Sequence, residues 1–489
     1  MTLNISKVLS LGSKMSMTAL ALSASLWLTS CNDDDTTVNV TVQNVLINSD
    51  ATNALRYPVS VATSGDCDVT IKYWPVKEPE NVRTTRTIHT SAPTANSINS
   101  AQLTINFVTP STPYCFQVET NGVTHEQVYT FTTSELPAGV PTYTINVDNG
   151  GAPEKGYILQ WQASNPGFVT FCDMQGRVVW YEKFDQAIRM AHYDTEHDCL
   201  CVLTGFRDGV NSKNFQRLCD KIITVDLYGN REIQWVASDD NVPYPHHDIK
   251  FTPEGNLIMV CNTIKNFDLS SYVTNNNGLA LGEDEEVWGD GFTIISRGGE
   301  VIRKWNNFEE MDPFNSDDII LEGGAVKDFL HANSVNWDSN GDYYMTFNRR
   351  SELWKIDGAT GKVLYRVGPK GNVKLDESGF ASGLHAVEPL APNKLLCLDN
   401  GEERGYSRAL IYEVDPAAMS AKVTMSVDFP AEFSSLDRSN VQLICNGTML
   451  MFGSTLGRCA LFADLEGNVL KVIKRNGISY RTYYYEDIK

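Results

Sequence analysis

A short motif recurs six times between residue 140 and the C-terminus, and it limits the possible folds more than any other feature. Each copy has an Asp or Ser, two or three further residues, usually a Gly, and then a strand-like run that often ends on an aromatic residue. The copies begin at Asp173, Asp226, Ser296, Asp357, Asp415 and Asp464. Their spacings of 53, 70, 61, 58 and 49 residues suit four short strands with their loops. The repeat therefore predicts a six-bladed β-propeller over residues 140–489.

A second motif lies ahead of most of these turns and consists of a polar strand start, a turn and an apolar strand. His247, His331 and His385 each open one such run. In a propeller the first strand of each blade lines the central channel, so residues at the starts of these strands converge near one mouth. The three imidazoles are therefore predicted to form one central site.

The remaining histidines of this region are interpreted differently. On a regular strand His246 and His247 would face opposite ways, so at most one points into the channel. His247 is preferred, because it lies eight residues before a turn residue, as His385 does. His192 and His197 flank acidic residues in a polar segment, which predicts solvated surface imidazoles.

Residues 38–136 form a separate β module in this interpretation. β-branched and aromatic runs are found at 38–47, 67–74, 101–108, 114–119 and 123–132, with Asn121-Gly122 as a hairpin turn. About seven strands in this length predict a β-sandwich. The run from Tyr114 to Thr133 resembles the closing strands of a fibronectin/Ig-like domain, which would serve as a spacer or a dimerisation module. Residues 134–141 read as a linker.

The N-terminus has the features of an export signal. Lys7 and Lys14 precede an apolar stretch over 19–28, which is too short to span a bilayer. The stretch ends in Leu-Thr-Ser before Cys31, which resembles a bacterial lipobox. This predicts a signal peptide at 1–30, membrane attachment through lipid on Cys31, and an acidic tether at 31–37. The protein would be a lipoprotein of the bacterial outer membrane, periplasmic or surface-exposed as in Bacteroidetes-type bacteria; the alternative is an ordinary secreted protein.

Composition excludes some classes of function. The net charge of -20 argues against nucleic acid, whose binding needs clustered Lys and Arg. Ten cysteines follow Cys31, so disulfides and buried reduced thiols are both open. The absence of a Cys-x-x-Cys pair argues against structural zinc, and no metal is assigned. The tryptophans are predicted to pack between blades, and the segment 266–290 to cover the channel mouth.

Several fragments of the propeller region resemble bacterial arylsulfotransferases. His331-Ala-Asn-Ser-Val with Arg349 and Ile356-Asp357 is similar to one signature of that family. Leu384-His385-Ala, with the following 398–401 and 407–412, is similar to its nucleophile blade. Further likeness is found at 246–248, 440–447 and Tyr480-Arg481, so that the resemblance covers most of residues 140–489.

The resemblance implies sulfuryl transfer from an aryl sulfate donor to a phenol acceptor, without a nucleotide or any other cofactor. His385 takes the place of the family's nucleophile, and His247, His331 and Arg349 form the polar cluster around it. Arg350 competes with Arg349, and the two face opposite ways on a strand. The related enzymes also suggest a homodimer.

The chemistry agrees with these residue types. A sulfuryl group spreads charge over three oxygens, which cationic donors stabilise, and a neutral imidazole can attack sulfur to give a covalent intermediate and ping-pong kinetics. A phosphate-binding Gly-x-x-x-x-Gly-Lys-Ser/Thr loop and the usual sulfatase motif are not apparent. The alternative is a lipid-anchored propeller that binds glycans or proteins, but such a scaffold has no need for three histidines and an arginine in its channel.

Overall fold

A computed structural model describes residues 40–91, 98–205, 219–236, 245–271, 282–310 and 330–488. The predicted signal peptide, Cys31 and the acidic tether lie outside these ranges. The regular structure within them is almost wholly antiparallel β-sheet, with short 3-10 turns at Asn307–Glu309, Glu377–Gly379 and Ala431–Phe433. This confirms the all-β class. In the same ranges no helix is long and apolar enough to span a bilayer.

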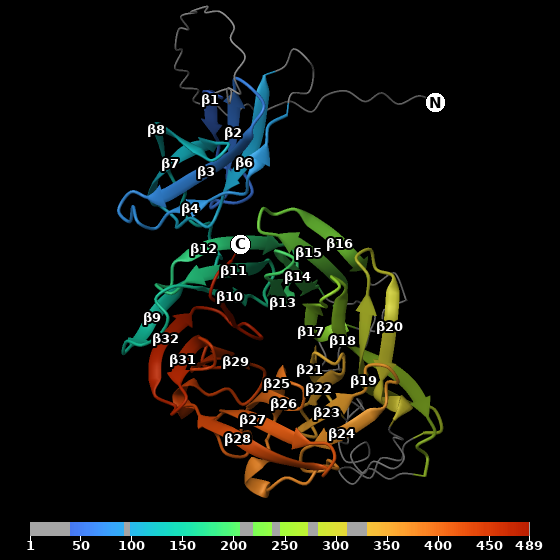
Figure 1. Cartoon of the computed structure of the whole chain (residues 1–489). Helices are drawn as coiled ribbons and strands as arrows, with labels where there is room; N and C mark the ends of the chain where they lie inside the picture. The colour runs from blue at the N-terminus through green and yellow to red at the C-terminus, as the bar shows by residue number, and fades with distance from the viewer. Residues whose placement is uncertain are drawn as a thin grey trace, which may run out of the picture.

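Six sheets of the described chain surround a common centre (Figure 1). Four are built from consecutive strands, the first being innermost, and these first strands contact one another around the channel. They are β13 (Ile188–Asp194), β14 (Cys199–Thr204), β15 (Lys221–Asp226) and β16 (Arg231–Val236); β17 (Pro245–Phe251), β18 (Leu257–Phe267), β19 (Glu285–Ile295) and β20 (Val301–Asn306); β21 (Ala332–Trp337), β22 (Tyr343–Phe347), β23 (Glu352–Ile356) and β24 (Val363–Val367); β25 (Leu384–Ala391), β26 (Lys394–Asp399), β27 (Arg408–Asp415) and β28 (Ser420–Asp428). The six-bladed propeller is confirmed.

The other two blades join the two ends of the propeller region. The first blade takes its innermost strand from the C-terminus, in the order β12 (Val178–Phe184), β11 (Gly167–Asp173), β10 (Tyr157–Trp161) and β33 (Tyr483–Tyr485). The last blade gains an outer fifth strand from the start of the region, in the order β29 (Asn440–Ile444), β30 (Met449–Ser454), β31 (Cys459–Asp464), β32 (Val469–Arg475) and β9 (Tyr143–Asp148). Strands from both ends of the region therefore close the ring.

The recurrent Asp-to-Gly motif forms the turn between the third and fourth strands of each blade. At the second copy the Asp226 carboxylate accepts hydrogen bonds from the backbone N–H groups of Tyr228 and Asn230, both at 2.9 Å. Gly229 follows at φ 87°, a left-handed conformation that glycine adopts without steric cost. In the degenerate copy at Asp415, Met419 takes the left-handed position at φ 47°.

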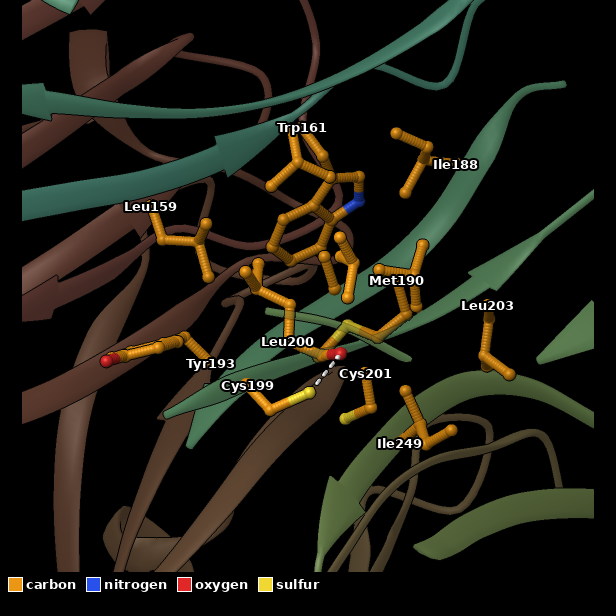
Figure 2. Packing of buried hydrophobic residues seen from close by; sticks show 14 of the residues in the cluster. Leu159, Trp161, Ile188, Met190, Tyr193, Cys199, Leu200, Cys201, Leu203 and Ile249 are labelled. Carbon is orange, nitrogen blue, oxygen red and sulfur yellow. Dashed lines mark hydrogen bonds between the residues drawn. The ribbon is translucent and has the colours of Figure 1, made fainter. Parts of the chain in front are cut away.

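Apolar side chains fill the space between neighbouring blades. Figure 2 shows Trp161 of β10 packed with Leu159, Met190 and Leu200, which come from the first two blades. The tryptophans are core residues, as predicted: each of the following is at most 3% exposed, namely Trp161, Trp180, Trp235, Trp305 and Trp354.

The segment 266–290, which is predicted to cover the channel mouth, is regular β-structure at both ends. Its two ends continue β18 and β19, which pair from Leu257 with Ile295 to Phe267 with Glu285. The ladder extends the third blade well beyond the length of its neighbours. Residues 272–281 lie outside the described residues, so the predicted cover over the channel mouth stays a prediction.

The N-terminal module consists of two antiparallel sheets that share one core. One sheet has the order β1 (Val42–Ile47), β2 (Tyr57–Thr63) and β6 (Asn99–Ile105). The other has the order β4 (Arg83–Thr84), β3 (Asp68–Pro75), β7 (Pro113–Thr120) and β8 (Val123–Thr132), with β5 (Ile88–His89) also paired to β3. Asn121 and Gly122 form the β7–β8 hairpin at φ 48° and 81°, as predicted. The fibronectin-type relationship and the dimerisation role stay predictions.

This module is hydrogen-bonded to the first blades of the propeller. The Arg56 guanidinium lies 2.7 Å from the Glu182 carboxylate, and both side chains are nearly buried. The Asn53 side-chain amide donates to the carbonyl oxygen of Tyr181 at 2.7 Å. The two parts are therefore joined by buried polar contacts as well as by the linker.

Two glycines of the repeated turn give a matched test of this contact. Gly229 and Gly467 have φ 87° and 89°, so alanine at either position costs about 1 kcal/mol of backbone strain. A Cβ at Gly229 would also collide with the Arg56 guanidinium, whereas at Gly467 the nearest atom is a carbonyl oxygen 3.3 Å away. We expect Gly229→Ala to lower the free energy of unfolding in urea by at least about 1 kcal/mol more than Gly467→Ala. Equal losses would contradict this expectation and show that the Arg56 side chain moves aside without measurable cost.

Candidate active site at one mouth of the channel

Three histidines from three consecutive blades line one cavity of about 360 Å³. His247 belongs to β17, His385 to β25, and His331 directly precedes β21. The rings of His247 and His331 lie 5.0 Å apart between centroids, at 71° to each other. The structure therefore brings together the three histidines that the repeat predicts to converge.

A shared backbone irregularity aims these side chains. His247 and His331 have φ 55° and 56°, and Ala386, directly after His385, has φ 50°. At the same point each inner strand shifts register against its neighbour, as a β-bulge does. Left-handed conformations at residues other than glycine cost about 1 kcal/mol each, and such strain is often found at functional sites.

The bulge overturns one expectation about the adjacent pair His246 and His247. Regular alternation would point the two rings apart, but their centroids lie 4.8 Å apart and their Nδ1 atoms 2.5 Å apart. Only His247 lines the cavity, whereas His246 is fully buried, with Nε2 3.6 Å from Asp290 Oδ1.

The two neighbouring arginines, Arg349 and Arg350, have different surroundings. Arg349 lines the cavity with the histidines. Arg350 is directed to Glu352, with Nε 3.2 Å from Oε2. The backbone N–H of Asn348 donates to the carbonyl oxygen of His331 at 3.0 Å, which holds the turn that carries Arg349 against the histidine segment.

The buried position of His385 determines its protonation. Burial lowers its pKa to about 3, so the imidazole is neutral at neutral pH. Its Nδ1 lies 3.2 Å from the carbonyl oxygen of Gly383. A carbonyl only accepts, so Nδ1 carries the proton and Nε2 keeps its lone pair. Burial, followed by the neighbouring histidines, likewise holds the pKa of His247 well below its usual value.

The structure adds residues that the sequence did not place in the site. Tyr480 and Arg438 line the cavity, and the Tyr480 ring lies 5.4 Å from that of His247. Arg481 does not line this cavity but the one at the other ends of the inner strands, and its guanidinium lies 2.9 Å from the Asp248 carboxylate. The resemblance to Tyr480-Arg481 was the signal in the sequence for two of these residues, and no signal pointed to Arg438.

His192 is not the solvated surface residue that the sequence predicts. It lies on the inner strand β13, and burial lowers its pKa to about 4. Its ring lies edge-on to Tyr483 at 5.3 Å, in a second cavity of about 450 Å³ at the opposite ends of the inner strands. The ring of His197 stacks on Phe251 at 5.4 Å. The polar residues around His192 and His197 in the sequence predicted a surface segment, although one side of this strand faces the inside of the propeller.

All ten cysteines after Cys31 lie in the described ranges and are free. Eight are buried, and Cys115 and Cys445 are partly exposed, so the reduced alternative agrees with the structure. In the described part of the chain, no three His, Cys, Asp or Glu side chains come together in a way that would hold a metal ion.

A family model described as arylsulfotransferase (ASST) matches residues 119–478. No curated protein matches the chain. Among solved structures, the propeller is similar to a protein of unknown function from Bacteroides caccae, at 11% identity and a TM-score of 0.41, over 68% of this chain and all of that one. An auxiliary nutrient binding protein from Bacteroides thetaiotaomicron matches at 9% identity and a TM-score of 0.32, over 89% of this chain and 86% of that one. Likeness at these scores is too weak to support an argument.

The protonation of His385 is open to direct measurement. With isotope-labelled histidine, we expect the Cε1 resonance of His385 to stay unchanged from about pH 8 to about pH 5, because its pKa lies near 3. His89 is the internal control: it is exposed, and hydrogen bonds to Asp68 and Asp66 raise its pKa, so its resonance moves within that range. His385→Asn and His89→Asn assign the signals. A midpoint above about pH 6 for His385 would contradict a neutral, desolvated imidazole.

Proposed function

The chain belongs to the arylsulfotransferase family, and we propose that it transfers the sulfuryl group in two steps through a sulfo-histidine at His385. One observation carries this proposal. A neutral imidazole, with its Nδ1 held by the Gly383 carbonyl, stands in a cavity whose walls also include His247, His331 and Arg349. Such a set provides a nucleophile together with cationic or hydrogen-bonding partners for an anion.

In the first step Nε2 of His385 attacks the sulfur of the aryl sulfate. The new N–S bond forms as the S–O bond to the phenol breaks, and its electron pair leaves with the phenolate oxygen. The Gly383 carbonyl keeps hold of the Nδ1 proton, and so stabilises the positive charge that develops on the ring. Nucleophilic catalysis of this kind divides one transfer into two easier ones.

The surrounding side chains act on the sulfuryl oxygens and the leaving group. Arg349 offers planar paired donors to oxygens whose negative charge is spread over three atoms. Burial holds the pKa of His247 low, and a bound sulfate anion favours its protonated form because opposite charges attract strongly in a desolvated site. The His331 ring lies 5.0 Å from that of His247 and is a second hydrogen-bond donor for the same oxygens. A protonated imidazole then gives its proton to the departing phenolate.

In the second step the acceptor phenol takes the place of the first product. Its oxygen attacks sulfur, the N–S bond breaks and the electron pair returns to Nε2 of His385, while a neighbouring histidine accepts the phenol proton. The cavity wall also includes Ala163, Ile478 and Tyr480, which give an aryl ring apolar surface. Both aryl groups use the same cavity in turn, so ping-pong kinetics follow.

The sequence and its resemblance to the family support three further features. The sulfuryl donor is not a nucleotide, the protein is anchored in the bacterial cell envelope by lipid on Cys31, and it forms a homodimer. Aryl sulfates are favoured over alkyl sulfates as donors, because a phenol with a pKa of about 10 is a better leaving group than an alcohol.

Replacing the nucleophile tests the assignment of His385. We expect His385→Asn and His385→Ala to lower turnover of 4-nitrophenyl sulfate with added phenol by at least about 1,000-fold, because the covalent step is lost. His192→Ala is the matched control: this histidine also lies on an inner strand but at the opposite mouth, and its rate should stay within about twofold. Circular dichroism confirms that each variant is folded. Turnover retained in the folded His385 variants would remove this residue from the nucleophile role.

The two-step mechanism predicts a burst. Donor added without acceptor should release nitrophenol in one rapid equivalent per active chain, after which release slows to hydrolysis of the intermediate. Mass spectrometry should then find one added SO3 group on the peptide that contains His385. Inert protein in this assay would favour the alternative of a binding propeller, and acceptor-dependent release without a burst or an adduct would favour direct transfer.

A further inference from the structure

We propose that Arg481 is a positioning residue for sulfuryl transfer. Arg481, Asp248 and Asn333 form a buried polar set, here called the bracket, which joins the three histidine-bearing blades. The inference rests on the proposed function of that cavity. Arg481 lies two residues before β33, the strand that closes the first blade, and is 1% exposed. It therefore belongs to none of the three blades whose histidines it would position.

The guanidinium contacts two histidine segments at once. Its Nη1 lies 2.9 Å from Asp248 Oδ1, and Asp248 directly follows His247. Its Nη2 donates to the carbonyl oxygen of Asn333 at 2.6 Å, and Asn333 lies two residues after His331. The planar fork of an arginine suits two acceptors in fixed positions, and a single lysine ammonium cannot reproduce that geometry.

Asn333 extends the bracket to the third histidine segment. Its side-chain amide donates to the carbonyl oxygen of Leu384 at 2.8 Å, directly before His385. Its side-chain oxygen accepts from Thr346 at 2.6 Å. One buried path, made of an ion pair and two hydrogen bonds, therefore runs from the segment of His247 through Arg481 and Asn333 to that of His385.

The Asp248 carboxylate completes the bracket on its other side. Its Oδ2 accepts from the Lys250 ammonium at 2.7 Å and from the backbone N–H of Val335 at 3.1 Å. Asp248 and Asn333 are fully buried. A buried ion pair adds little net stability over apolar side chains of the same size, because desolvation offsets the attraction. Fixing the geometry of the left-handed histidine segments is a function that apolar residues in these positions would not perform.

The positive charge of Arg481 also affects the protonation of the nearby histidines. After burial, it is among the causes that lower the pKa of both His247 and His385. The bracket thus favours the neutral form of the imidazole that attacks, in addition to holding its blade in place.

The test compares Arg481→Met and Arg481→Lys with a matched buried cation. Lys355 forms buried ion pairs with Asp338 and Asp342 in the fourth blade and does not line the histidine cavity. With 4-nitrophenyl sulfate as donor, we expect Arg481→Met to lower the burst rate by about 100-fold with KM changed by less than about threefold, because the nucleophile is displaced. Arg481→Lys should recover about tenfold of that loss by keeping the charge beside Asp248. Lys355→Met should lose stability but keep its burst rate within about threefold.

A second variant keeps the inference testable if Arg481→Met does not fold. Asn333→Ala removes the link to Leu384 and leaves the ion pair with Asp248, so it should lower the burst rate by about tenfold at unchanged KM. The positioning role would be overturned if folded Arg481→Met or folded Asn333→Ala had a burst rate within threefold of that of Lys355→Met. Failure of the proposed function is distinguishable, because the unsubstituted protein would then show no burst and no sulfo adduct.

Discussion

Closure of the ring is the constraint on which the rest of the molecule depends. The histidines come from three consecutive blades and are more than fifty residues apart in sequence, and they meet only because the blades are held around one axis. Two strands provide that closure: β33 pairs with β10 inside the first blade, and β9 pairs with β32 outside the last. Arg481, next to β33, carries the closing segment into the centre and contacts the site itself. Fold closure and site geometry are therefore coupled through adjacent residues.

The chemistry of the site depends on local departures from regular strand geometry. Bulges at the starts of three inner strands turn His247, His331 and His385 toward one point, at the cost of left-handed backbone. Burial then keeps the imidazoles of His247 and His385 neutral. Both features lower stability locally and are supported by the packed blades around them, in which the inter-blade tryptophans are almost fully buried. A rigid scaffold thus holds strained backbone segments and desolvated imidazoles.

The sequence predicted those parts of the fold that short-range signals encode. Turns such as the one at Asp226 have a residue signature, so blade number and strand order could be derived from them. The convergence of the histidines followed from the repeat. The contact of His246 with His247 did not, because a bulge built on residues other than glycine has no such signature. His192 was misjudged for a related reason: polar neighbours in the sequence say little about which side of an inner strand faces a closed channel.

The missed role of Arg481 shows the limit of local patterns most clearly. Its partner Asp248 lies more than two hundred residues earlier, and the two meet only after the ring is complete. This arrangement also sets an order of events during biosynthesis. A ribosome must release residues 481–485 before the innermost strand of the first blade and the bracket beneath the histidines can form. Until then the nascent polypeptide has the side chains of the site without their arrangement.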